Sequence, residues 1–123
     1  MDRKIALKWA RALESGKYKQ GQSQLRDENN NFCCLGVLCN LHAQAHPEIA
    51  AEQDDPEEYM GDGGLLPQAV VEWAGMNSDN GTFITPVDID NFCEVNDVVE
   101  LNANHDFNFK KIAAIIRKKS DEM

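Results

Sequence analysis

One apolar stretch decides the fold, and it reads Phe32-Cys33-Cys34-Leu35-Gly36-Val37-Leu38-Cys39-Asn40-Leu41-His42. Nine of these eleven residues are apolar, Gly included, and they hold three of the four cysteines. The stretch must be buried, because each Leu or Phe side chain left in water forfeits roughly 1.5–3 kcal/mol of transfer free energy. Its leucines and His42 recur at intervals close to those of a helical stripe. The pattern therefore predicts a central helix over residues 33–45, ended by Pro47.

The cysteines of this stretch are expected to be free, buried thiols. In an apolar helix Cys behaves as a small hydrophobic residue, and an intracellular chain keeps it reduced. Zinc needs four N or S ligands, usually from two short pairs, and Cys39 with His42 supplies one pair without an evident second. Apolar surroundings also raise the pKa of a thiol, which disfavours a catalytic cysteine. We therefore expect neither a metal nor a cysteine nucleophile, and no cofactor.

Three further helices are predicted around the central one. They begin near Asp2, Pro67 and Asn108, each a residue type that favours a helix N-terminus. Gly16 and Gly75 supply the left-handed ends of the first two. The first helix spans about 3–15. The apolar faces are formed by Ile5, Trp9 and Leu13, by Val70, Val71 and Trp73, and by Phe109, Ile112, Ala113 and Ile116.

The remaining segments predict a little β structure and a surface loop. Residues 23–26 and 31–33 read as a hairpin, and residues 82–85 as a strand stopped by Pro86. For the part that follows, both a helical turn near 88–91 and a helix start near Asn96-Asp97 fit the sequence. Residues 48–62 predict an acidic loop, with a helical turn at 47–52. The fold class is thus a compact, mostly helical α+β domain over residues 1–123, with about four helices and a small antiparallel sheet or hairpin.

Charge is distributed very unevenly along the chain, whose net charge is −9. Residues 27–109 contain no Lys or Arg and seventeen Asp or Glu, while the basic residues lie in 1–26 and in the last fourteen positions. Such an interval creates a negative field that repels nucleic acid and attracts cationic surfaces. We expect a protein partner rather than direct nucleic-acid binding. The chain has no apolar run of membrane-spanning or signal-peptide type, so we also expect no membrane partner and a cytoplasmic location.

The polar segment after the first helix is the candidate ligand site. It carries Lys17, Tyr18, Gln20, Gln22 and Arg26, a mixture of neutral and cationic groups that suits a small polar ligand or a phosphate. The competing interpretation is that the glutamine side chains only satisfy the backbone of a loop. The sequence leaves both open.

Several short motifs occur together along the chain. They are Ser15-Gly16-Lys17-Tyr18-Lys19-Gln20-Gly21, Leu25, the run from Phe32 to Cys39, Leu66-Pro67 with Trp73, Asn96-Asp97, and Phe109-x-x-Ile112-Ala113-x-x-Ile116. In these motifs the chain resembles a family of small uncharacterised proteins of bacteriophages and prophages, although the stretch between Asn96-Asp97 and Phe109 is longer than usual. The resemblance implies a phage accessory protein acting in the host cytoplasm, and implies no chemistry. We count Asn96 and Asp97 among the candidate ligand-binding residues.

Three functions fit these features. The first is a non-enzymatic binder that modulates a host protein, such as a defence or nucleic-acid-handling factor, through an acidic surface. The second is a small-molecule binder, for instance a sponge for a nucleotide-derived signal, with its pocket near residues 17–26. The third is a small hydrolase. A homo-oligomer is compatible with each of them.

Overall fold

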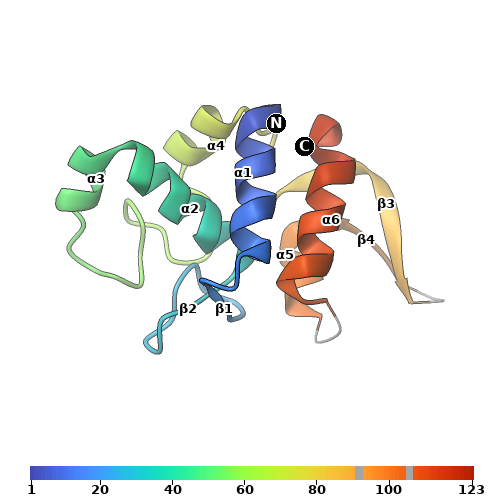
Figure 1. The fold of residues 1–123 in the computed structure, drawn as a ribbon, viewed down its shortest axis with the longest axis horizontal. Coiled ribbons are helices and arrows are strands. Elements are labelled where there is room, and N and C mark those ends of the chain that lie inside the picture. Colours follow the sequence, from blue (N-terminus) through green and yellow to red (C-terminus); the bar gives the residue numbers. More distant parts are fainter. Residues whose placement is uncertain (91–92, 105–106) are drawn as a thin grey trace.

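The computed structural model describes residues 1–90, 93–104 and 107–123 (Figure 1). Its helices are α1 (Arg3–Glu14), α2 (Cys34–Ala45), α3 (Pro47–Ala51), α4 (Gln68–Ala74), α5 (Val98–Ala103) and α6 (Phe109–Lys119), and a 3-10 turn η1 (Ser120–Glu122) follows α6. Its strands are β1 (Lys19–Gln20), β2 (Asn31–Phe32), β3 (Thr82–Asp90) and β4 (Cys93–Asp97). The predicted α+β class is confirmed. The four expected helices are α1, α2, α4 and α6, and the short α3 and α5 add to them.

Helix α2 is the centre of the core, as the apolar stretch predicts. Every residue from 33 to 39 is buried, and α2 packs against α1, α4 and α5. Trp9 of α1 is fully buried and donates its indole N–H to the carbonyl oxygen of Cys34 at 2.8 Å. Gly36 is the point of closest approach, because a Cβ atom there would lie 1.8 Å from the carbonyl oxygen of Leu25. The backbone before β2 can therefore reach α2 only because residue 36 has no side chain.

Helices α1 and α6 lie side by side (Figure 1). Their inner faces contribute Ala6, Trp9, Ala10, Leu13, Phe109, Ile112, Ala113 and Ile116 to the core, which confirms the predicted register of the last helix. On the outside, Arg117 pairs with Glu14 at 2.5 Å. The predicted caps are also present, since Asp2 accepts the N–H of Ile5 and Asn108 accepts the N–H of Lys111.

The predicted hairpin of residues 23–26 with 31–33 is confirmed only in part, as one antiparallel bridge with a backbone hydrogen bond from Cys33 to Gln24 at 3.3 Å, and it forms no regular strand pair. Strand β2 pairs in parallel with β1 instead, in the register Lys19↔Asn31, and Arg26 contributes only an isolated bridge to Phe32. The physical reason lies at Ser23, whose φ of 71° is left-handed and interrupts any strand before residue 24. The backbone N–H of Leu25 then turns away to the carbonyl oxygen of Gly63 at 2.8 Å.

The antiparallel sheet lies elsewhere, in the β3–β4 pair. Strand β3 does not stop at Pro86, because the ladder only shifts register between Thr82 and Val87 and then resumes. A proline lacks the N–H of one ladder bond, which interrupts the pairing without ending the strand. The helical turn expected near 88–91 is wrong for residues 88–90, which are in β3, and residue 91 lies outside the described residues. The alternative helix start is confirmed, because Asp97 caps α5 by accepting the N–H of Glu100 at 2.8 Å.

The acidic segment forms α3 and then an irregular loop, as expected. We define the acidic loop as residues 52–62. The loop is not independent of the core, because Tyr59 is 5% exposed and its backbone pairs with Asp62 in an isolated bridge. Throughout the described ranges, the helices are too short or too polar to cross a membrane.

Candidate functional site

The polar segment 17–26 does not surround a single pocket. Gln20 donates its amide N–H groups to Asn102 Oδ1 at 3.3 Å and to the carbonyl oxygen of Phe107 at 2.9 Å. Gln22 makes longer contacts with the carbonyl oxygens of Asn102, at 3.4 Å, and Ala103, at 3.3 Å. Both glutamines thus fasten the segment to the end of α5. The sequence left two interpretations open, and the hydrogen bonds of Gln20 and Gln22 to backbone carbonyls fit the one in which these side chains satisfy backbone groups.

Asn102 is the polar residue at the centre of this contact, and sequence reasoning did not single it out. It is 2% exposed, its Oδ1 also accepts the N–H of Cys34 at 3.1 Å, and its Nδ2 donates to the carbonyl oxygen of Gly21 at 2.8 Å. One amide therefore joins α2, α5 and the segment before β2. An asparagine directly after the buried Leu101 was the only local signal of this role.

Two further predicted ligand-binding residues, Asn96 and Asp97, take no part in the hydrogen bonds of Asn102 described above. Asn96 is exposed, and the carboxylate of Asp97 is occupied by the N-terminus of α5. Lys17 is also exposed, and its backbone N–H donates to Ser15 Oγ at 3.2 Å. The predicted residues are therefore divided among separate places rather than assembled into one site.

Tyr18 and Arg26 lie together around the ring of Phe32. The Tyr18 ring meets Phe32 edge-on at 5.1 Å, and its hydroxyl accepts a hydrogen bond from Asn40 Nδ2 at 2.6 Å. The guanidinium carbon of Arg26 lies 5.3 Å from the centroid of Phe32, and Arg26 Nε donates to Asn30 Oδ1 at 2.6 Å. These contacts place Arg26 and Asn40 at the edge of a cavity.

The cavity has a volume of about 330 Å³ and lies between α2 and the acidic loop. Arg26 and Phe32 line it together with Leu25, the α2 residues Gly36, Cys39, Asn40 and Ala43, and the residues Ala50, Gln53, Asp54, Pro56, Glu57, Glu58 and Tyr59. Ligand pockets for small molecules begin near this volume and combine an apolar wall with a few polar groups. This cavity has both, and we call it the α2 cavity.

The loop wall of the α2 cavity is held in place by hydrogen bonds. Gln53 Nε2 donates to the carbonyl oxygens of Asp55, at 3.1 Å, and Glu58, at 2.7 Å. The Tyr59 hydroxyl lies 2.6 Å from Nδ1 of His42, on α2. Burial raises the pKa of Tyr59 to about 12 and lowers the pKa of His42, so the contact joins two neutral groups at neutral pH. The wall therefore keeps its shape without a ligand.

The three thiols of the apolar stretch, of which Cys39 lines the α2 cavity, are poorly reactive. Cys33, Cys34 and Cys39 are free and buried, as predicted, and burial raises the pKa of each of them. A thiol that remains protonated at neutral pH is a poor nucleophile and a poor metal ligand. Among the described residues, no three His, Cys, Asp or Glu side chains are grouped in a way that could hold a metal ion.

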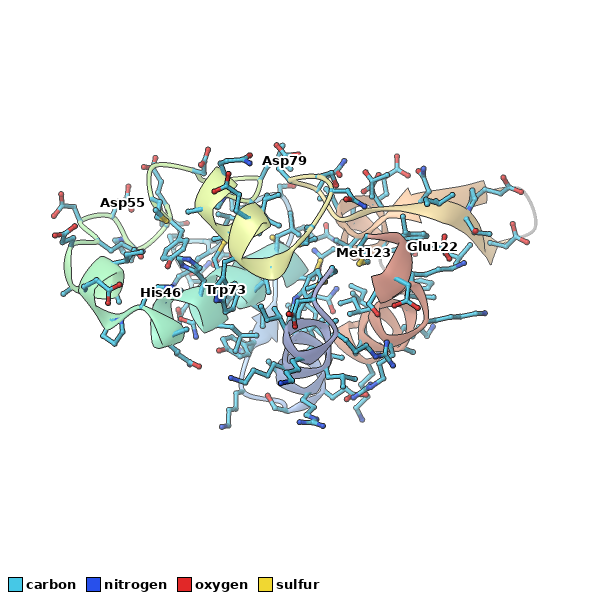
Figure 2. All side chains as sticks on the ribbon, turned by 90° about the horizontal axis from the view of Figure 1, so that it is seen from above. His46, Asp55, Trp73, Asp79, Glu122 and Met123 are labelled. Carbon is cyan, nitrogen blue, oxygen red and sulfur yellow. The ribbon has the colours of Figure 1, made fainter. Side chains whose placement is uncertain are left out.

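The charges lie on different parts of the surface. Most exposed cations lie on α1 and α6, which are neighbours, and Lys17 and Lys19 follow α1. The exposed carboxylates between α2 and β3 form what we call the acidic surface, and they are Glu48, Glu52, Asp54, Asp55, Glu58, Asp62, Glu72 and Asp79. Figure 2 shows Asp55 and Asp79 on the side of the molecule that faces away from α1. The protein therefore presents a largely negative region, which Arg26 adjoins at the α2 cavity.

Comparison with known proteins gives one match. The family model described as "Domain of unknown function (DUF8296)" matches residues 1–120. Searches of curated proteins and of solved structures each found no significant match. Because the family model covers nearly the whole chain, this protein belongs to the DUF8296 family, a domain of unknown function.

Proposed function

We propose that this protein is a non-enzymatic binding protein that modulates a host protein by docking its acidic surface onto a cationic region of that partner. The motif resemblance supports a phage-type accessory role in the host cytoplasm. A defence factor or a nucleic-acid-handling factor is the kind of partner that offers such a region, because its own ligand is polyanionic. The acidic surface then occupies the place of a nucleic-acid backbone.

The observation that carries this proposal is the separation of charge. The exposed carboxylates of the acidic surface lie in a sequence interval without Lys or Arg, while most of the cations are on the adjacent helices α1 and α6. A field of one sign attracts an oppositely charged partner over distances comparable with the screening length, which is roughly 10 Å at 0.1 M salt. The buried, protonated thiols add no nucleophile that would favour an enzyme.

The test is affinity capture from a bacterial host lysate with two matched variants. The first neutralises four carboxylates of the acidic surface outside the α2 cavity, by Glu48→Gln, Glu52→Gln, Glu72→Gln and Asp79→Asn. The control neutralises four exposed cations of α1 and α6, by Lys4→Gln, Lys8→Gln, Lys110→Gln and Lys118→Gln. Captured proteins are identified by mass spectrometry and then measured as purified partners by calorimetry.

We expect a partner that binds the wild-type protein and the cation variant but binds the carboxylate variant at least tenfold more weakly. Its affinity should fall as salt rises from about 0.1 M to about 1 M, where the screening length shrinks to roughly 3 Å. Equal binding to both variants, binding that salt does not change, or the absence of any captured protein would each contradict the proposal.

A further inference from the structure

The α2 cavity contains separated charges of opposite sign. Arg26 lines it beside Phe32, and Asp54, Glu57 and Glu58 line it from the acidic loop. Within the described residues the ion pairs join other groups, so none of these carboxylates lies within 4.0 Å of the Arg26 guanidinium. A cation and three carboxylates thus share one cavity without neutralising each other.

Arg26 can still donate hydrogen bonds to a ligand from this position. It is half-buried, its Nε donates to Asn30, and its guanidinium carbon lies 5.3 Å from the centroid of the Phe32 ring. In the part of the chain that the structure describes, the two terminal Nη atoms donate no hydrogen bond to a protein group. A guanidinium held in this way can bind one carboxylate through two parallel hydrogen bonds.

The carboxylates that line the cavity from the acidic loop favour a cationic group on the ligand. Carboxylates only accept hydrogen bonds, so Asp54, Glu57 and Glu58 favour a ligand end that carries several N–H donors and a positive charge. Asn40 also lines the cavity, where its Nδ2 donates to the Tyr18 hydroxyl and its Oδ1 can accept a hydrogen bond. The apolar atoms of Phe32, Leu25 and Ala43 suit a short aliphatic middle part.

We infer that the α2 cavity binds a small zwitterion of the basic amino-acid class, with its carboxylate on Arg26 and its cationic end on the carboxylates of the acidic loop. One guanidinium matches one carboxylate, and a volume of about 330 Å³ lies at the small end of the range for ligand pockets. This site shares Asp54 and Glu58 with the acidic surface proposed above for docking, and the docking test neutralises neither of them.

The experiment is an NMR titration of the ¹⁵N-labelled full chain with L-arginine and with agmatine, which has the same guanidinium but no carboxylate. L-Arginine should shift the amide signals of residues lining the cavity, such as Gly36, Asn40 and Ala43, and agmatine should bind at least tenfold more weakly. Arg26→Gln should reduce the affinity for L-arginine to that for agmatine and leave agmatine unchanged. Lys17→Gln, a neutralised exposed cation of the same segment, is the matched control and should bind like wild type.

A double variant with Asp54→Asn and Glu58→Gln should weaken both ligands. The wild-type pattern of amide signals in each variant confirms that it is folded. Equal binding of L-arginine and agmatine, insensitivity to Arg26→Gln, or no shifts with millimolar L-arginine would overturn the inference. Preferential binding of AMP would do so as well, because it would assign the cavity to a nucleotide. The variant with Glu48, Glu52, Glu72 and Asp79 neutralised should still bind L-arginine, so the two proposals fail independently.

Discussion

His42 Nδ1 and the Tyr59 hydroxyl lie 2.6 Å apart, and this buried contact fastens the acidic loop to the central helix. His42 also stacks on His46 at 4.2 Å and meets the ring of Trp73 edge-on at 5.1 Å. Nδ1 of His46 faces the carbonyl oxygen of His42 at 2.9 Å and must therefore carry a proton. The cluster joins α2, α4 and the loop through stacked and edge-on aromatic rings.

The first prediction concerns the pH dependence of stability. The pKa of His42 is lowered from 6.5 by burial and by the neighbouring His46, with Glu48 acting weakly in the other direction. Below pH 6.5 the unfolded chain therefore binds more protons at this position than the folded protein does, so stability should fall as pH decreases from about 7 toward 5. Urea unfolding at several pH values measures this. In His42→Gln the decrease over that window should be smaller, although the variant is less stable overall, and an unchanged slope would contradict the assignment.

The second prediction concerns Gly36. Helix propensity alone says that Gly36→Ala should stabilise α2 by about 1 kcal/mol. The 1.8 Å approach to the carbonyl oxygen of Leu25 reverses the sign, because backbone must move to admit a methyl group. We expect a loss of several kcal/mol, or no folded protein. Gly63→Ala, where the nearest atom is a side-chain carbon at 3.7 Å, is the control and should change stability by less than about 1 kcal/mol.

The third prediction concerns Asn102. Asn102→Ala removes the partners of the Cys34 N–H, the Gly21 carbonyl and the Gln20 amide, of which the first is fully buried. Each buried group left unpaired costs about 1–3 kcal/mol, so we expect a total loss of about 2–5 kcal/mol in the free energy of unfolding. Asn96→Ala changes an exposed asparagine on β4 and should stay within about 0.5 kcal/mol of wild type. Similar losses in the two variants would rule out the role assigned to Asn102.

The fourth prediction concerns the thiols. In a Cys93→Ser background, Cys33, Cys34 and Cys39 should react with a thiol reagent only on the timescale of unfolding, because all three are buried and their pKa values are raised. Addition of denaturant should release all three at once. Rapid reaction of one thiol in the native protein would show that the apolar stretch is open to solvent.

The features of this fold that were predicted correctly from the sequence are those that depend on residues close together in the chain. The apolar stretch around α2 and the caps at Asp2 and Asn108 each depend on residues within a few positions of one another. The pairing of β1 with β2 could not be predicted in this way, because it follows from the left-handed Ser23 and from the contact of Leu25 with Gly63. Pattern reasoning expected the more common hairpin instead.

The candidate site was predictable only in its residue types. Arg26 was named as a cation for a ligand, but its cavity is completed by residues 53–59, whose position depends on the contact between Tyr59 and His42. Gln20 and Gln22 were named for a pocket and instead bind the end of α5, about eighty residues away. No spacing within the segment 17–26 contains that information.

Asn102 also constrains how the chain can be synthesised. The N–H of Cys34 and the carbonyl of Gly21 can form their native hydrogen bonds only after residue 102 has been synthesised, and until then they bond to water. These native contacts of the first 45 residues therefore form late, after α5 has been added. A translational pause before α5 would prolong the exposure of the most apolar segment of the protein.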